Sequence, residues 1–556
     1  MEWLNDYSRK FLDNGYLING QSAEERIRFM ADTAEKINGT KGLADKIYDY
    51  ASRGFYSFSS PVWSNFGLER GLPISCFGSY LGDDMSNILY TNAEVGMMSK
   101  YGGGTSGYFG ALRPRGAEIK NNGASSGAVH FMQLFDKGID IVSQGAVRRG
   151  SFAAYLPVEH DDIEEFLEIG KEGNPIQRIT TGVTVTDAWL NDMKSGDAKK
   201  RKIWAKVIQA RGEMGYPYIL FTDNCNNGAP EVYQDKNMKI QASNLCTEIM
   251  LPSSTDESFV CCLNSINIAK YDEWKDTDAV ECMIYFLDAV LQEFVDKLAK
   301  LRDSEDKDDR LAFTFMERAY NFAHNHRALG LGALGWHSYL QSKMIPFEHP
   351  DAMALNKEIF QLIHDKSYQA SEDLAKMLGE APLLKGYGRR NTTLNAIAPN
   401  TSSAFILGQV SQGIEPWWSN TYVKDLAKMK VTIKNTELEK LLEAKGKNDR
   451  DTWASIRDHD GSVRHLDFLS QLEKDVFKTF SEINQFVIID QAADRQKFID
   501  QAQSLNLMVH PDTSAKDINA LYMDAWEQGI KTLYYQHSKS AAQELSRKIS
   551  CVGCEA

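Results

Sequence analysis

Three side chains between Ala242 and Ile249 have the chemistry of catalytic groups and share one spacing. Asn244, Cys246 and Glu248 place an amide, a thiol and a carboxylate at every second position. In an extended backbone this spacing directs all three to one face. A thiol between a hydrogen-bonding amide and a potential general base is suited to radical or nucleophilic chemistry on a hydroxylated substrate. Taken alone, this pattern favours a buried structural cysteine at Cys246.

A second pair of thiols, Cys551 and Cys554, ends the chain in the sequence CVGC. This spacing is suited to thiol–disulfide exchange, because one thiolate attacks a disulfide and its neighbour resolves the mixed disulfide. Few apolar residues follow Lys539, so we expect a mobile tail over 539–556. Half of a zinc site is the alternative, but no second CxxC or nearby His pair supports a metal site.

A mobile dithiol needs a disulfide to reduce, and the interior candidates are Cys76, Cys246, Cys261 and Cys262. The N-terminus lacks the features of a secretory signal, and no apolar run approaches the ~18 residues of a membrane span. We therefore expect a cytoplasmic protein, in which cysteine pairs are more often catalytic or metal-binding than structural. At this point a dithiol oxidoreductase or a binding protein is also compatible with the pattern.

Composition identifies a globular chain. Of its 556 residues, 43% are hydrophobic and 11% are aromatic, so a large core can form and disorder is excluded. The formal net charge of −14 provides no basic field for nucleic acid or an anionic membrane. Small anionic ligands at local sites remain compatible.

The elements that must position these thiols are a mixture of helices and strands. Residues 57–150 are rich in Gly, Ser and Asn between short apolar runs, a pattern typical of strands and functional loops more than of long helices. Apolar periodicity predicts helices in 1–55, 281–301, 351–378, 464–504 and 515–529, and strands at 393–397 and 531–535. No internal repeat or low-complexity linker divides them, which favours one large α/β core over about 60–540.

Six segments, in order along the chain, resemble the catalytic (large, α) subunit of class I ribonucleotide reductase. They are ISCFGSYLGD (74–83), SNLCTEI (243–249), CCLNSINI (261–268), HRALGLGALG (326–335), APNTSS (398–403) with GIEP (413–416), and TLYYQ (532–536). The resemblance runs from about Ser59 to the C-terminus. It implies that ribonucleotides, expected to be diphosphates, are reduced to 2′-deoxyribonucleotides by a thiyl-radical mechanism.

The resemblance also implies catalytic roles. Cys246 would be the transient thiyl radical that takes the 3′-hydrogen, Glu248 would accept the 3′-hydroxyl proton, and Asn244 would hold the same region. Cys76 would protonate the departing 2′-hydroxyl and supply electrons by forming a disulfide with Cys261.

Two adjacent cysteines at the second redox position depart from the family pattern. Aligning Ser265 and Asn267 with the family's C-x-x-x-S-x-N spacing selects Cys261. Cys262 is then expected to point to the opposite face.

Substrate and effector residues follow from the same resemblance. The substrate diphosphate needs hydrogen-bond donors more than positive charge. The substrate-binding residues would be Asn400, Thr401, Ser402 and Ser403, with Ser60 and Ser75 on the opposite wall, where turn formation is their alternative role. A deoxynucleoside triphosphate or ATP would bind as specificity effector at a homodimer interface, with Asp83 on its ribose, Arg113 on its phosphates, and Gln144 and Arg148 in a relay loop.

The fold implied by the resemblance is a ten-stranded α/β barrel of two five-stranded halves with a central finger loop. We expect an N-terminal helical region over 1–58, the catalytic barrel over 59–538 and the redox tail over 539–556. No segment like the family's N-terminal ATP-cone precedes Cys76, so we expect a short form without that on-off switch.

The adjacent Tyr534 and Tyr535 indicate how the radical arrives. Two neighbouring phenols serve to relay a radical from outside, which an adenosylcobalamin-dependent reductase, the nearest alternative, does not need. The resemblance implies a separate ferritin-like β subunit that holds the metal or radical cofactor, no intrinsic cofactor in this chain, and thioredoxin or glutaredoxin as the reductant of the tail.

Overall fold

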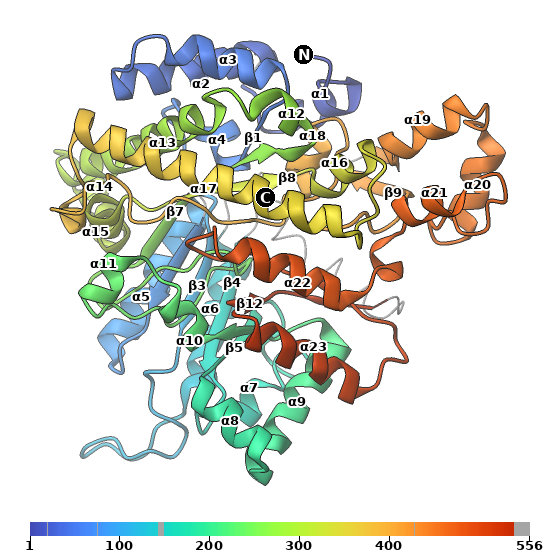
Figure 1. Cartoon of the computed structure of the whole chain (residues 1–556). Helices are drawn as coiled ribbons and strands as arrows, with labels where there is room; N and C mark the ends of the chain where they lie inside the picture. The colour runs from blue at the N-terminus through green and yellow to red at the C-terminus, as the bar shows by residue number, and fades with distance from the viewer. Residues whose placement is uncertain (19, 75, 143–149, 427–428, 539–556) are drawn as a thin grey trace.

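A curled sheet runs through the middle of the molecule, and helices lie around it (Figure 1). The computed structural model describes residues 1–18, 20–74, 76–142, 150–426 and 429–538. None of the helices in these residues combines the length and the apolar character needed to cross a bilayer.

Five parallel strands form the first half of the sheet. In spatial order they are β2 (Cys76–Tyr80), β3 (Gly104–Tyr108), β4 (Ser151–Pro157), β5 (Thr180–Val185) and β6 (Tyr218–Phe221). Residues of both strand faces are buried in β4, β5 and β6, as is typical of parallel strands covered on both sides. Helices between consecutive strands make the crossover connections that parallel pairing requires.

The second half is also parallel, but it contains shorter ladders. β7 (Phe259–Asn267) pairs with β8 (Leu329–Leu334). Isolated parallel bridges then join β8 to 393–397 and that segment to 501–505. Finally, β11 (Leu507–Met508) pairs in parallel with β13 (Gln536–His537), which follows β12 (Thr532–Leu533).

Two antiparallel seams close the halves into a ring. β2 pairs with β7 at one seam, and β6 pairs with β12 at the other. Within the described residues, the ring therefore has ten strands in two five-stranded halves, which confirms the predicted barrel. The segment 243–249 bonds to strands of both halves, because the Tyr155 hydroxyl on β4 donates to Asn244 O at 2.7 Å and the Thr532 hydroxyl on β12 donates to Thr247 O at 3.0 Å. A segment that reaches both halves must run inside the ring.

The N-terminal residues form three helices beside the barrel. These are α1 (Asp6–Asp13), α2 (Ala23–Asn38) and α3 (Leu43–Ser52), followed by β1 (Tyr56–Phe58), which pairs antiparallel with β7. α2 begins at a capping box in which the Ser22 hydroxyl and the Glu25 carboxylate each accept from the other residue's backbone N–H.

Two predictions of secondary structure were partly wrong. Residues 57–150 contain two long helices, α5 (Met85–Lys100) and α6 (Ala128–Ile141), which the polar, Gly-containing sequence did not indicate. The region 464–504 is divided into α21 (Gln471–Val476), a 3-10 turn and α22 (Gln485–Gln496), because capping boxes at Ser470 and Thr479 begin new short elements.

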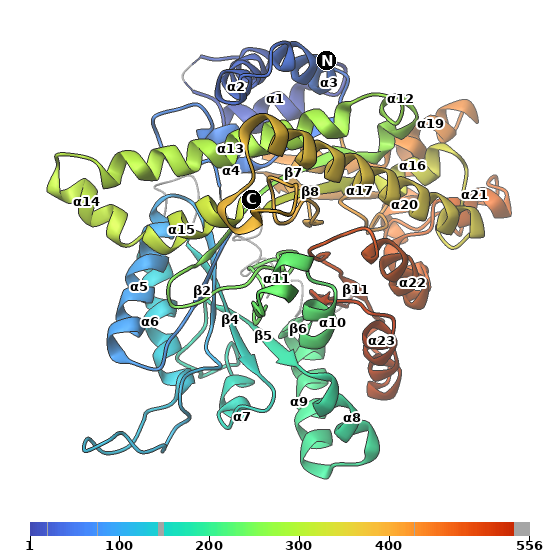
Figure 2. The same ribbon diagram turned by 60° about the vertical axis from the view of Figure 1, so that its left-hand side comes forward.

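Other helices cover the barrel and its ends, and Figure 2 shows α5 and α6 on the side of β2 to β4. They are α4 (Ser60–Asn65), α7 (Ile163–Phe166), α8 (Asp187–Ser195), α9 (Ala198–Met214), α10 (Thr222–Asn227), α11 (Glu231–Asp235), α12 (Tyr271–Trp274), α13 (Ala279–Arg302), α14 (Lys307–Thr314), α15 (Glu317–His326), α16 (Trp336–Ser342), α17 (Pro350–Leu378), α18 (Thr401–Ile406) and α23 (Ala515–Glu527). The hairpin β9 (Thr421–Leu426) and β10 (Met429–Lys434), with α19 (Thr436–Ala444) and α20 (Arg450–Asp458), leads into a small lobe with its own apolar cluster.

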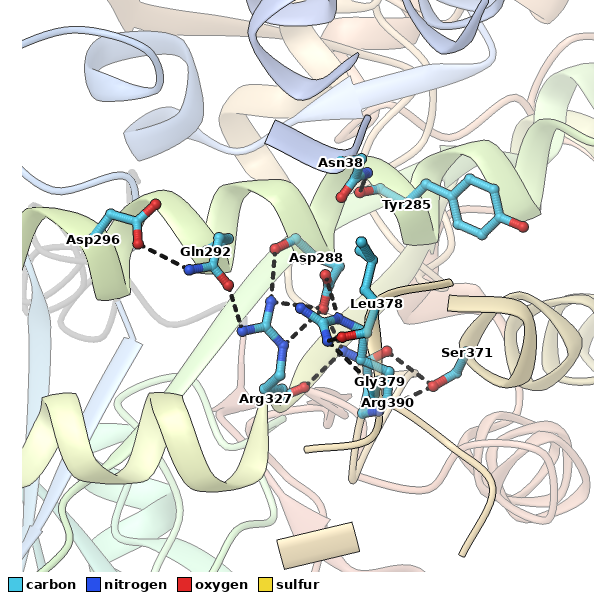
Figure 3. A network of polar contacts seen from close by, with 11 residues as sticks. Asn38, Tyr285, Asp288, Gln292, Asp296, Arg327, Ser371, Leu378, Gly379 and Arg390 are labelled. Carbon is cyan, nitrogen blue, oxygen red and sulfur yellow. Dashed lines mark hydrogen bonds and ion pairs between the residues drawn. The ribbon is translucent and has the colours of Figure 1, made fainter. Parts of the chain in front are cut away.

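A buried charge network anchors the second half of the barrel to its outer helices (Figure 3). Asp288 of α13 accepts from Arg327 Nε at 3.1 Å, from Arg390 Nε at 2.8 Å and from Asn391 Nδ2 at 3.0 Å. Arg327 directly precedes the segment entering β8, and Asn391 precedes 393–397. Burial opposes ionisation of Asp288, but the two guanidinium groups outweigh it and lower the pKa of the carboxyl. One carboxylate thus holds the starts of two neighbouring strands.

Candidate active site

The predicted catalytic residues surround one open cavity inside the barrel. About 750 Å³ is free of protein atoms here, a volume that includes the open mouth of the cavity. Asn244, Cys246, Glu248 and Cys76 all line it. The cavity thus joins the finger loop to the seam between β2 and β7.

Local hydrogen bonds hold the finger loop in a bent conformation. Asn244 Oδ1 accepts from the Ile249 amide at 3.2 Å and from the Ser243 hydroxyl at 3.2 Å. Thr247 has a positive φ of 68°, a conformation that β-branched residues rarely adopt. The loop therefore turns between Cys246 and Glu248 and is not the regular extended strand assumed from the spacing, yet all three predicted side chains reach the same cavity.

Glu248 is the ionisable group of the cavity with a clear pKa shift. Its side chain is buried, and burial raises the pKa to about 7 despite opposing hydrogen bonds that include one from Ser504. The Ser504 hydroxyl lies 3.2 Å from Glu248 Oε2 and 2.5 Å from the Cys246 carbonyl oxygen. Ser504 thus links the carboxylate to the backbone of the thiol residue, a contact that the sequence did not indicate.

The interior cysteines meet across the seam. Cys76 of β2 and Cys261 of β7 are directly paired in the antiparallel register. Opposed residues in such a ladder have Cα atoms roughly 4.5 to 5.5 Å apart, within the range that a disulfide spans. Both are thiols in this structure. Cys262 instead pairs with Leu329 of β8 and is absent from the lining of the cavity.

Asn244 connects the finger loop to this cysteine pair. Its Nδ2 lies 3.8 Å from Cys76 Sγ, a contact to sulfur that a weak hydrogen bond allows. The amide therefore touches one thiol while its other end fixes the loop.

The substrate-binding residues predicted at 400–403 divide between the cavity and the core. Asn400, in the left-handed conformation, and Ser403 line the cavity. Ser402 is buried, and the Thr401 hydroxyl donates to Gln412 Oε1 at 3.3 Å. Asn400 Nδ2 also donates to Ser265 Oγ at 3.0 Å, which fixes the loop to β7.

On the opposite wall, the cavity is lined by two serines that are close in sequence to Ser60, the predicted residue. Ser57 and Ser59 line it, whereas the Ser60 hydroxyl lies 3.3 Å from Tyr16 Oη. Alternation along β1 could have indicated Ser57 and Ser59 as the two side chains of one face. Asn264 and Ser265 of β7 complete this part of the lining, and neither was predicted to bind substrate.

The two predicted radical-transfer tyrosines form a buried aromatic cluster. The ring centroids of Tyr534 and Tyr535 are 4.4 Å apart, and those of Tyr218 and Tyr534 are 4.9 Å apart. They directly follow Thr532 and Leu533 of β12, and the Thr532 hydroxyl bonds the finger loop at Thr247. The pair is thus on the strand that supports the predicted radical cysteine.

Of the four predicted effector-binding residues, Asp83 and Arg113 lie within the described residues, and they contact each other. Arg113 Nε lies 2.8 Å from Asp83 Oδ2, in a partly exposed ion pair at the start of α5. Ser75, Gln144, Arg148, Cys551 and Cys554 lie outside the described residues. Among the residues that are described, no group of three or more His, Cys, Asp or Glu side chains could hold a metal ion.

Comparison with known proteins identifies the family. The family model described as "Ribonucleotide reductase, barrel domain" matches residues 74–200, 190–386 and 381–536. The chain belongs to the ribonucleotide reductase family. The solved structure of the Actinobacillus ureae class Id ribonucleotide reductase alpha subunit is 55% identical, with a TM-score of 0.90, over 99% of each chain.

Named relatives of this reductase extend to viruses and fungi. The ribonucleoside-diphosphate reductase large subunit of Invertebrate iridescent virus 3 is 32% identical over 95% of this chain and 92% of its own. The ribonucleoside-diphosphate reductase large chain of Schizosaccharomyces pombe is 28% identical over 99% of this chain and 76% of its own length. This reductase is therefore a class I large subunit, and the adenosylcobalamin-dependent alternative is not supported.

Proposed function

We propose that this cavity is where a ribonucleoside diphosphate loses its 2′-hydroxyl, with the radical delivered by a separate subunit. The observation that carries the proposal is the meeting of Cys246, Glu248 and Cys76 at one cavity, with Cys261 paired opposite Cys76. A thiol, a base and a dithiol are the groups that the reaction requires. The thiol, the base and one sulfur of the dithiol line this cavity, and the second sulfur lies directly opposite Cys76 on the neighbouring strand of the sheet.

The proposed reaction balances within these residues. Cys246, as a thiyl radical, takes the 3′-hydrogen and returns it at the end of the cycle. Glu248 accepts the 3′-hydroxyl proton, and Cys76 gives a proton to the 2′-hydroxyl, which leaves as water. Cys76 and Cys261 together lose two electrons and two protons and become a disulfide. One of these protons leaves with the hydroxyl as water, the other is placed with the electrons at C2′, and Glu248 returns its proton to the 3′-oxygen. A pKa of about 7 leaves a substantial fraction of Glu248 ionised near neutral pH, so that it can act as the base.

The diphosphate would lie at the loop that precedes α18. Asn400 and Ser403 line the cavity there, and the backbone N–H groups at this turn are donors suited to phosphate oxygens. Ser57 and Ser59 offer hydroxyls on the facing wall.

The radical would arrive through Tyr535 and Tyr534. Phenol rings with centroids 4.4 Å apart are close enough to exchange an electron, and Tyr534 is on the strand that contacts the finger loop. A ferritin-like β subunit would hold the metal or radical cofactor, and thioredoxin or glutaredoxin would reduce the C-terminal dithiol.

A homodimer with bound effector would form over α5 and α6. These neighbouring helices expose large apolar side chains, including Met85 at 55% and Ile141 at 79% of their surface, which is unfavourable for a face left in water. Asp83 and Arg113 lie at the start of α5, where their ion pair would open to receive the ribose and phosphates of a deoxynucleoside triphosphate or ATP.

Activity measured with separated components tests this proposal. The chain alone should not reduce ribonucleoside diphosphates, and the addition of a ferritin-like radical subunit should start turnover. Ribonucleoside triphosphates should be poorer substrates under the same conditions. Turnover by the chain with adenosylcobalamin alone would contradict the proposed radical route.

A further inference from the structure

The amide of Gln501 contacts the buried thiol of the cysteine pair. Gln501 Nε2 lies 3.3 Å from Cys261 Sγ, 2.9 Å from the Leu329 carbonyl oxygen and 3.0 Å from Thr393 Oγ1. At its other end, Gln501 Oε1 accepts from the Met250 amide at 3.0 Å. The side chain is completely buried. These contacts determine the orientation of the amide, with its donor end toward the sulfur.

One of the two hydrogens on Gln501 Nε2 is available to the Cys261 sulfur. An amide nitrogen carries two hydrogens, and the Leu329 carbonyl takes one of them. The other lies between Thr393 Oγ1 and Cys261 Sγ. The Thr393 hydroxyl donates its own hydrogen to Leu329 O at 3.0 Å, so toward Gln501 it only accepts. An ionised sulfur is a stronger acceptor than a neutral hydroxyl, so this donor would turn to Cys261 whenever it becomes a thiolate.

The two sulfurs of the pair differ in access. Cys76 is partly exposed and lines the cavity, whereas Cys261 is 1% exposed and does not line it. Burial raises the pKa of the Cys261 thiol well above its ordinary value, and the hydrogen bond from Gln501 opposes that effect. A reductant that enters the cavity therefore reaches Cys76 first, and Cys261 needs help to leave as a thiolate.

We propose that the disulfide is reduced with a fixed polarity and that Gln501 is the positioning residue that enforces it. An incoming thiolate attacks Cys76 Sγ, the Cys76–Cys261 bond breaks, and Cys261 leaves as a thiolate that accepts from Gln501 Nε2. The second thiol of the reductant then attacks the reductant's own sulfur in the mixed disulfide, so that Cys76 leaves. The two thiol protons of the reductant end on Cys76 and Cys261, and the reductant becomes a disulfide. The inference rests on the proposed function only for the pairing of these two cysteines.

The first experiment measures chemical reduction of the disulfide by dithiothreitol. The full chain carries Cys246→Ser, Cys551→Ser and Cys554→Ser, is oxidised, and is then quenched with an alkylating reagent at successive times. Gln501→Met keeps the length of the side chain but removes the donor, and the rate should fall about tenfold or more, the effect of a lost hydrogen bond to a charged group. Thr393→Val keeps that donor and should stay within about twofold of the parent rate.

The equilibrium between the protein disulfide and dithiothreitol distinguishes two explanations for a slow Gln501→Met variant. One is a structural defect, and the other is lost assistance to the leaving thiolate. The disulfide and the neutral dithiol are both uncharged, so loss of a bond that matters only for the thiolate should leave the equilibrium with dithiothreitol unchanged in Gln501→Met. A shift of the equilibrium as large as the change in rate would overturn the assignment. A parent-like rate in Gln501→Met would overturn it as well.

The second experiment tests which of the two sulfurs can be reached from the cavity and does not depend on the Gln501 variant. In the same background, Cys261→Ser leaves Cys76 and Cys76→Ser leaves Cys261. With dipyridyl disulfide as the probe, and with labelled cysteines identified by mass spectrometry, Cys76 should react at least about ten times faster. Equal or faster labelling of Cys261 would overturn the polarity. If oxidation forms no Cys76–Cys261 disulfide at all, the pairing in the proposed function is wrong, and this inference is wrong with it. A disulfide that forms normally but shows the opposite polarity overturns this inference alone.

Discussion

At the scale of single residues, the site depends on a few polar atoms held inside an otherwise apolar barrel. Cys246 and Glu248 lie at the cavity and are not assigned to the diphosphate. We expect Cys246→Ser and Glu248→Ala to lower turnover by at least about a thousandfold, the scale on which removal of a reacting group acts, with substrate binding largely retained. Turnover and equilibrium binding of a ribonucleoside diphosphate check this. A loss of binding as large as the loss of turnover would remove these residues from the chemical step.

The raised pKa of Glu248 makes the free energy of unfolding depend on pH, and this dependence can be measured without turnover. Its ordinary pKa of 4.5 is raised to about 7 in the folded state, so between these pH values the native chain binds more protons than the unfolded chain. The free energy of unfolding should therefore decrease as the pH rises through this window. The contribution is on the order of 3 kcal/mol.

Glu248→Gln should remove this pH dependence, because the amide does not titrate. Denaturant unfolding at about pH 5 and pH 8 compares the two proteins, and the variant should become the more stable one at the higher pH. Parallel pH profiles would show that the carboxylate titrates near its ordinary value. In the active enzyme, turnover should rise with pH through about 7 as Glu248 loses its proton.

At the scale of elements, the second half of the barrel depends on contacts outside the sheet. Its segments 393–397 and 501–505 are paired by short runs of backbone hydrogen bonds, and Asp288 of α13 adds side-chain bonds just before the first of these segments. Asp288→Asn leaves two buried guanidinium groups, on Arg327 and Arg390, without their counter-charge. We expect the free energy of unfolding to decrease by roughly 3 to 5 kcal/mol.

Asp296→Asn on the same helix is the matched control for that variant. Asp296 accepts from Gln292 at the exposed end of the network (Figure 3), and its replacement should change stability by less than about 0.5 kcal/mol. Urea unfolding of both variants decides the point. Equal stability of Asp288→Asn and the parent chain would show that the network does not anchor these strands.

At the scale of the whole molecule, a cavity inside a closed ring separates the disulfide from any protein reductant. A dithiol attached to the same chain would overcome this separation, because tethering raises its effective concentration at the cavity. We expect the double variant Cys551→Ser, Cys554→Ser to complete about one turnover from its pre-reduced thiols and then stall with thioredoxin-like reductants. Dithiothreitol, which is small enough to enter the cavity, should restore turnover at least partly.

Product formed per enzyme in a rapid-quench experiment measures this prediction. The parent chain with thioredoxin is the control, since it should continue beyond the first turnover. Normal cycling of the double variant with thioredoxin would show that the tail carries no electrons. Loss of the first turnover too would indicate a structural or metal-binding role for the two cysteines.

The sequence by itself determined the family and its chemistry. Asn244, Cys246 and Glu248 were singled out because their residue types and their spacing can be read from a single sequence. The order of the six segments implied the ten-stranded ring, and the helical stripes indicated most outer helices. Local signals such as these survive in a single sequence because they depend on neighbouring residues.

Only the tertiary structure decided which distant residues meet. Strand register brings Cys261 opposite Cys76 although 185 positions separate them in the sequence, in agreement with the pairing that the family resemblance implied. It also brings Ser504 to Glu248 and Gln501 to Cys261, contacts that span more than 200 residues. Neither α5 and α6 nor these polar contacts were indicated locally, because packing against the barrel overrides weak sequence periodicity and because a buried amide is recognised only by the partners that folding brings to it.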